Sequence, residues 1–184
     1  MPTQPTKKYA LPLAGLALAA GLVWLPGCGG APPEDAAKNP ASSSGVARPL
    51  YAYAQMNDLR VAPQLGMGFY AIEEGGWRWM AKEARMMLRA PENPKSQFEV
   101  RLTLPKGQVS SLGAMTFSVL FNDKPFADAT YTVDGDYTFT KDVPPGLLTQ
   151  APVHVTLRWN KARPPAPGGD ARELGAVIVG VGFK

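Results

Sequence analysis

The sequence predicts an all-β protein built as an antiparallel β-sandwich, and two observations carry this prediction. Residues 98–104 and residues 153–159 alternate apolar and polar side chains, which is the pattern of strands with one buried face. The 184 residues include 19 glycines and 19 prolines, a composition that favours short strands and turns over long helices. We therefore expect a β-sandwich, preceded by segments that serve export and tethering.

Residues 1–27 have the three parts of a secretory signal peptide. Lys7 and Lys8 precede an uncharged apolar run over residues 9–25, and the small residue Gly27 ends the segment. Pro12 and the glycines of the run weaken a helix that would barely span a bilayer, so a permanent transmembrane helix is the weaker alternative. The segment predicts an exported protein.

The residues that follow resemble the lipobox of bacterial lipoproteins, in which the cysteine thiol is diacylated and becomes the first residue of the mature chain. The resemblance rests on Leu25, Gly27 and Cys28, with a departure at Pro26, where the family more often has Ala or Ser. It implies lipidation of Cys28, for example with palmitate, and a membrane anchor that two or three acyl chains hold without release. Because Gly29 is not the Asp that retains such proteins at the inner membrane, the resemblance favours the outer membrane, facing the periplasm, or the cell surface.

Residues 28–49 form the lipidated cysteine and a linker. The segment is made mainly of Gly, Ala, Pro, Ser and Asn and has no apolar periodicity. We expect it to be disordered and to hold a domain of residues 50–184 clear of the lipid headgroups.

Residues 50–184 are expected to form one domain of short strands. Besides the two alternating segments, apolar or aromatic runs lie at residues 67–72, 77–80, 84–88, 115–121, 136–139 and 174–183. Turn signals separate them, at residues 74–76, 91–94, 105–107, 122–125, 134–136, 144–146 and 164–169. Roughly seven to nine strands with one polar face each favour an antiparallel sandwich over a parallel α/β fold. Residues 81–89 are open to two interpretations, a turn of helix or another strand.

Three segments of this domain resemble β-sandwich modules attached to bacterial glycosyltransferases and other envelope sugar proteins. They are residues 68–88, with Gly68-Phe69-Tyr70 and Trp77-Arg78-Trp79-Met80, residues 119–125, and residues 172–183. Those modules are similar to jelly-roll carbohydrate-binding domains. The resemblance implies a jelly-roll-like sandwich and a carbohydrate-binding-like function.

The candidate ligand-binding residues lie around two tryptophans. Trp77 and Trp79 face the same way in a strand, and Arg78 faces the other way. Two indoles on one face are typical of a platform on which the apolar C–H face of a sugar ring stacks, and Tyr70, Glu73 and Arg78 are candidates to bind its hydroxyls. The alternative is that both tryptophans belong to the sandwich core, which uses large aromatics, and the sequence favours this alternative over the platform.

Other residues are expected to be structural. Trp159 ends an inward-facing row and is predicted to lie in the core, while His154 is predicted to be exposed. Arg172 and Glu173 precede the last strand and are expected to form structural ion pairs, either with each other or with Glu73 and Arg78.

Composition and motifs exclude several functions. Cys28 is the only cysteine and His154 the only histidine, which excludes internal disulfides and His/Cys zinc sites. Without residues 1–27 the chain has 17 basic and 15 acidic residues and no basic stripe, so we expect no nucleic-acid partner. No nucleophile elbow, phosphate loop or marked carboxylate pair is present, and we expect no catalytic residue, metal or cofactor.

The sequence therefore predicts a lipid-anchored envelope protein that binds a cell-envelope glycan or a glycan-linked partner without catalysis. The alternative is an assembly or scaffold lipoprotein that binds another envelope protein through a strand edge or loop.

Overall fold

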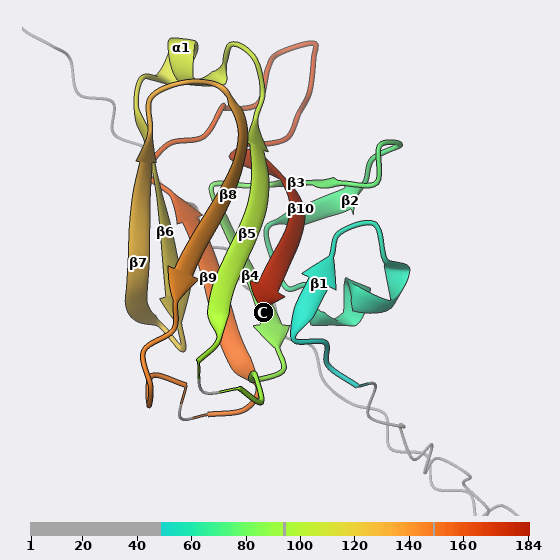
Figure 1. Cartoon of the computed structure of the whole chain (residues 1–184). Helices are drawn as coiled ribbons and strands as arrows, with labels where there is room; N and C mark the ends of the chain where they lie inside the picture. The colour runs from blue at the N-terminus through green and yellow to red at the C-terminus, as the bar shows by residue number, and fades with distance from the viewer. Residues whose placement is uncertain (1–48, 94, 149) are drawn as a thin grey trace, which may run out of the picture. The chain divides into compact units, whose positions relative to one another are not determined.

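The structure, a computed structural model, describes residues 49–93, 95–148 and 150–184. The predicted signal peptide, Cys28 and the linker up to residue 48 lie outside the described residues. Two antiparallel sheets pack face to face, which confirms the predicted all-β sandwich (Figure 1). Within the described residues, no helix is both long and apolar enough to cross a membrane.

The described strands divide between two sheets, here called sheet A and sheet B. Sheet A contains β1 (Tyr53–Gln55), β2 (Phe69–Ile72), β3 (Arg78–Met80), β5 (Gln97–Leu104), β8 (Gly135–Asp142) and β10 (Ala176–Phe183). Sheet B contains β4 (Glu83–Leu88), β6 (Met115–Phe121), β7 (Lys124–Tyr131) and β9 (Val153–Trp159). Two short helices complete the described fold, a 3-10 helix η1 (Leu59–Gln64) and α1 (Gln108–Leu112).

Strands β3 to β10 follow the path of one long antiparallel hairpin wrapped into two layers. β6 pairs with β7, β5 with β8, β4 with β9, and β3 with β10. Successive pairs go to alternate sheets, and the pairings of β10 with β5 and of β9 with β6 join them. This is the arrangement of a jelly roll, as the sequence predicted.

The tip of this hairpin is a turn that the sequence signals by its residue types. Asn122 and Asp123 have φ angles of 49° and 64°, and Phe121 pairs with Lys124 across them. Two consecutive residues with positive φ make a type I′ turn, which matches the twist of the flanking strands.

The core lies between the two sheets and is rich in aromatic rings. Phe98 of β5 contacts Phe121 of β6 at a ring-centroid distance of 5.0 Å, and Phe117 of β6 contacts Phe139 of β8 at 5.5 Å. Trp159 is fully buried beside Phe117, which confirms its predicted place in the core. The described part of residues 49–184 contains the strands of both sheets and the core between them. Because a chain of this length buries most of its unfolded surface, we expect residues 49–184 to fold without the preceding segments.

Some elements were not expected from the sequence. The structure places β1, η1 and α1 in segments whose sequence shows no strand or helix pattern. Strand β7 begins inside the predicted turn at residues 122–125 and continues to Tyr131, where no strand was predicted. Residues 83–88 form β4, which settles the open interpretation of residues 81–89 in favour of a strand.

Candidate ligand-binding face of sheet A

Trp77 and Trp79 lie outside the sandwich core. In the register of sheet A, Trp79 is opposite Val177, Val177 is opposite Thr103, and Thr103 is opposite Asp136. Residues directly opposite each other share one face of a sheet, and Thr103 and Asp136 alternate with the buried residues of β5 and β8. Trp79 therefore belongs to the outer face of sheet A, where both indoles are only partly buried. The interpretation of both tryptophans as core residues is wrong, because β3 turns its other face inward.

The two indoles do not form one flat platform. Their ring centroids are 6.1 Å apart and the ring planes meet at 79°. The Trp77 ring packs on the turn before β3, where a Cβ at Gly75 would lie 2.2 Å from its Nε1 atom. A flat ligand can stack on one of these rings at a time.

Arg78 does not belong to this surface. It is opposite Ile178, a fully buried core residue, and is itself 8% exposed. Its Nε atom donates to the carbonyl oxygen of Met56 at 3.2 Å, and its Nη1 atom to that of Tyr70 at 2.9 Å. Arg78 is therefore removed from the candidate ligand-binding residues, because its hydrogen bonds hold β2 and the end of β1 to β3.

Tyr70 and Glu73 meet at the β2 edge, where Arg172 connects them. Arg172 Nη1 donates to Glu73 Oε1 at 2.7 Å, which confirms the expected ion pair, and its guanidinium lies 5.2 Å from the centre of the Tyr70 ring. The Tyr70 hydroxyl donates to the carbonyl oxygen of Glu173 at 3.0 Å. The hydrogen bonds that Arg172 donates to Asp170 and Glu73 raise the pKa of its guanidinium. Both candidate residues are already engaged by the protein.

A polar depression lies on the outer face of sheet A, between β5, β8 and β10. The side chains that line it include Arg101, Thr103, Asp136, Thr138 and Val179. Thr103 Oγ1 donates to Asp136 Oδ1 at 2.6 Å. No sequence motif marks these residues as a site, although the alternation of residues 98–104 places Arg101 and Thr103 on the face opposite the core.

The depression borders a β-bulge in β10. The register of β10 against β5 shifts between Ile178 and Gly180, so that Val179 is the extra residue of a β-bulge. Gly180 is opposite Arg101, and the phenol of Tyr53 fills the space beside it, since a Cβ at Gly180 would lie 2.7 Å from the Tyr53 hydroxyl oxygen. β-Bulges are over-represented next to active sites, and Val179 lines the depression.

A hydrogen-bonded cluster forms one end of this face. The hydroxyl of Tyr53 donates to Glu99 Oε1 at 2.9 Å, and Lys184 Nζ donates to Glu99 Oε2 at 2.7 Å. Burial raises the pKa of Tyr53 to about 12, together with the hydrogen bond to Glu99. Burial would also raise the pKa of Glu99, but the hydrogen bonds from Lys184 and Tyr53 outweigh it and hold that pKa below its ordinary value.

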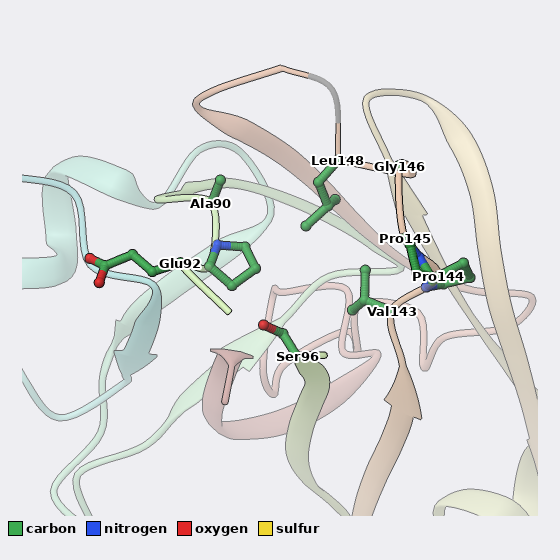
Figure 2. A pocket seen from close by; sticks show the side chains of 9 residues that line it. Ala90, Glu92, Ser96, Val143, Pro144, Pro145, Gly146 and Leu148 are labelled. Carbon is green, nitrogen blue, oxygen red and sulfur yellow. The ribbon is translucent and has the colours of Figure 1, made fainter. Parts of the chain in front are cut away.

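Figure 2 shows a second pocket, formed by loops at one end of the sandwich. Its lining is mostly proline and aliphatic, with Ser96 and Glu92 as polar members. The Ser96 hydroxyl donates to the carbonyl oxygen of Asn93, and Glu92 points away from the pocket and pairs with Arg89 at 3.0 Å. The polar side chains of this pocket therefore leave few hydrogen-bonding groups for a ligand.

The outer face of sheet B is charged. Glu83 pairs with Arg158 and Arg85 at 2.8 Å and 2.9 Å. His154 is exposed on this face, as predicted, and is opposite Met87. The described residues contain no group of three or more His, Cys, Asp or Glu side chains arranged to hold a metal ion.

Comparisons with known proteins give a distant likeness among solved structures. No protein-family model and no curated protein matches the sequence. Among solved structures, the chain is similar to a family GH115 4-O-methyl-alpha-glucuronidase with specificity for decorated arabinogalactans, with a TM-score of 0.35 and 11% sequence identity. The match covers 59% of this chain and 14% of that protein, and a likeness at this level defines neither the fold nor the function of this chain.

Proposed function

We propose that this protein is exported, anchored through a lipid on Cys28 to the outer membrane or cell surface, and binds an envelope glycan or a glycan-linked partner through the outer face of sheet A. The observation that carries the binding proposal is the position of Trp77 and Trp79, two partly exposed indoles on the same outer face of sheet A as a polar depression. Sugar rings need such a combination, because their C–H faces are apolar and their hydroxyls require polar neighbours.

The anchor is supported by the sequence of residues 1–28 alone. Mass spectrometry of the mature protein is expected to find residues 1–27 removed and an acylated glyceryl group on Cys28. The Cys28→Ser variant should lose this modification and leave the membrane fraction. A bare thiol or a retained leader in the wild type contradicts the anchor.

The binding step is proposed without catalysis. His154, the only histidine of the chain, lies on the outer face of sheet B and so does not approach the tryptophans. Asp136 is bound to Thr103, and Glu99 to Tyr53 and Lys184. These contacts favour a binding surface over a reacting centre.

The test is calorimetric titration of residues 49–184 with glycans selected on a glycan array. Trp77→Ala and Trp79→Ala are each expected to weaken binding by about tenfold or more, as loss of a stacking aromatic does. Met67→Ala is the matched control, because Met67 is also a large exposed apolar residue, at 67% exposure, but lies elsewhere. Absence of binding, or binding unchanged in both tryptophan variants, contradicts the proposal.

One observation favours the second candidate function, docking of another envelope protein. Met67 lines two neighbouring pockets beside β4, one of them with Leu65 and Met87. With Pro63, Leu65 and Met87 it lines an apolar patch, and contiguous exposed apolar patches mark protein-binding surfaces. In that case the Met67→Ala variant loses the partner and the tryptophan variants keep it.

A further inference from the structure

We propose that the depression between β5, β8 and β10 is the polar half of a single site whose apolar half is Trp79, and that its ligand is an uncharged oligosaccharide lying across the strands of sheet A. This inference rests on the proposed function and deepens it by naming the class of ligand.

The register of sheet A fixes how the two halves lie relative to each other. Trp79, Val177, Thr103 and Asp136 form one row across β3, β10, β5 and β8. Neighbouring strands are ~4.8 Å apart, so the row spans roughly 14 Å. Val177, between the two halves, is 7% exposed, so the surface there is covered by its neighbours. A ligand that touches both Trp79 and Asp136 is therefore longer than one sugar ring and runs across the strands.

The depression offers both donors and acceptors. Asp136 Oδ1 accepts the hydrogen bond from Thr103, and its Oδ2 atom makes no hydrogen bond with a described residue. None of the ion pairs between described residues includes Arg101, which is exposed. A sugar hydroxyl both donates and accepts, so neighbouring hydroxyls can accept from Arg101 and donate to Asp136.

The charges on this face balance, and this favours an uncharged ligand. Arg101 and Asp136 line the same depression, the charge of Arg101 also helps to lower the pKa of Glu99, and Lys184 is paired with Glu99 at 2.7 Å. A sugar with a carboxylate or sulfate group gains from Arg101 but is repelled by Asp136 and Glu99. An anion-binding surface needs an excess of basic residues, which this face does not have.

The experiment is calorimetric titration of residues 49–184 with two probe sets, short neutral hexose oligomers and hexuronic acid oligomers of the same length. We expect the neutral oligomers to bind and the acidic ones to bind at least about tenfold more weakly. Because the ligand is uncharged, affinity should stay within about twofold between roughly 0.05 M and 0.5 M salt. The corresponding monosaccharide should bind far more weakly than the oligomer.

Two variants test the depression itself. Asp136→Asn and Arg101→Gln are each expected to weaken binding by about tenfold, through loss of a charge-assisted hydrogen bond. Asp142→Asn is the matched control, since Asp142 is an exposed carboxylate of the same strand and face that contacts Gln97 at 2.8 Å. Thermal unfolding should show that all three variants remain folded.

The outcomes separate this inference from the proposed function. Binding that is lost in Trp79→Ala but unchanged in Asp136→Asn and Arg101→Gln overturns the polar half and leaves glycan binding in place. Stronger binding of the hexuronic acid oligomers, with affinity that falls as salt rises, overturns the uncharged ligand. Binding by no oligomer of either set, or on the glycan array, overturns both proposals.

Discussion

Arg78 lies directly opposite Ile178 in the antiparallel register of β3 and β10, so a guanidinium group shares a layer with a fully buried core residue. This relationship decides the orientation of β3. Because Arg78 and Met80 point inward, Trp77 and Trp79 point outward. The burial of one arginine therefore places two tryptophans on the candidate ligand-binding face.

Replacing Arg78 by Leu is expected to lower the free energy of unfolding by about 1–3 kcal/mol. The carbonyl oxygens of Met56 and Tyr70 lose their hydrogen-bond donors. The variant no longer has to bury a charged group, but this gain offsets only part of that loss. Burial lowers the pKa of Arg78, which shows that its charge carries a desolvation cost. Urea unfolding measures the change. Arg78→Lys, which keeps a donor, should lose less, and a Leu variant as stable as the wild type contradicts this role.

Strand periodicity predicted most of the fold because it reports which residues are buried. Residues 98–104 and 153–159 form most or all of β5 and β9. Strand β7 was not predicted because it is an edge strand without fully buried residues, so its alternation is weak. Strand β1 is three residues long and exists because it pairs with residues 180–182 of β10, far away in the sequence.

The candidate site was predictable only where it is local. The spacing of Trp77 and Trp79 correctly predicted that they share a face, but not which face is outward. The depression depends on the pairing of β5, β8 and β10 and on a bulge at Val179. Tyr53 donates a hydrogen bond to Glu99, which lies 46 residues away in the sequence, and no local sequence pattern predicts such a contact.

Replacing Asp123 by Gly is expected to stabilise the protein by about 0.5 kcal/mol, with a rise of a few degrees in Tm. Asp123 has a φ of 64°, a conformation that costs a residue with a side chain more than glycine. Differential scanning calorimetry measures the effect. The control is Asp128→Gly within β7, opposite Ser118, where the same change should destabilise the strand. Equal shifts in both variants contradict the turn assignment.

The carboxylate of Glu99 is expected to make stability depend on pH in the acidic range. Its pKa in the folded protein is lowered, so its contribution is fully present above the ordinary value of 4.5 and is lost as pH falls through the lower folded value. The urea concentration at the midpoint of unfolding should be measured at several pH values above and below the folded pKa of Glu99. As pH falls, this midpoint should decrease more steeply in the wild type than in Glu99→Gln. Glu92→Gln, at an exposed ion pair, should leave the wild-type profile unchanged.

Tyr53 is expected to ionise at about pH 12, and its hydroxyl should remain protonated where ordinary tyrosines have lost their proton. Because the folded pKa is raised, the contribution of Tyr53 to stability is fully present below the ordinary value of 10.0 and is lost as pH rises toward about 12. Ultraviolet titration of the phenolate measures this. Burial also raises the pKa of Tyr131, which should therefore still titrate late in Tyr53→Phe. The phenol that titrates at about pH 12 should disappear in Tyr53→Phe, and a titration that is the same in this variant and in the wild type contradicts the cluster.

Tryptophan fluorescence should separate one buried indole from two accessible ones in residues 49–184. Trp159 is fully buried, whereas Trp77 and Trp79 are partly exposed. The double variant Trp77→Phe and Trp79→Phe is expected to emit at shorter wavelength than the wild type and to resist quenching by iodide, because only Trp159 remains. Each single Phe variant should lose part of the quenchable signal. If the double variant is quenched as strongly as the wild type, the assignment of the outer face of sheet A is wrong, and the proposed glycan site loses its aromatic half.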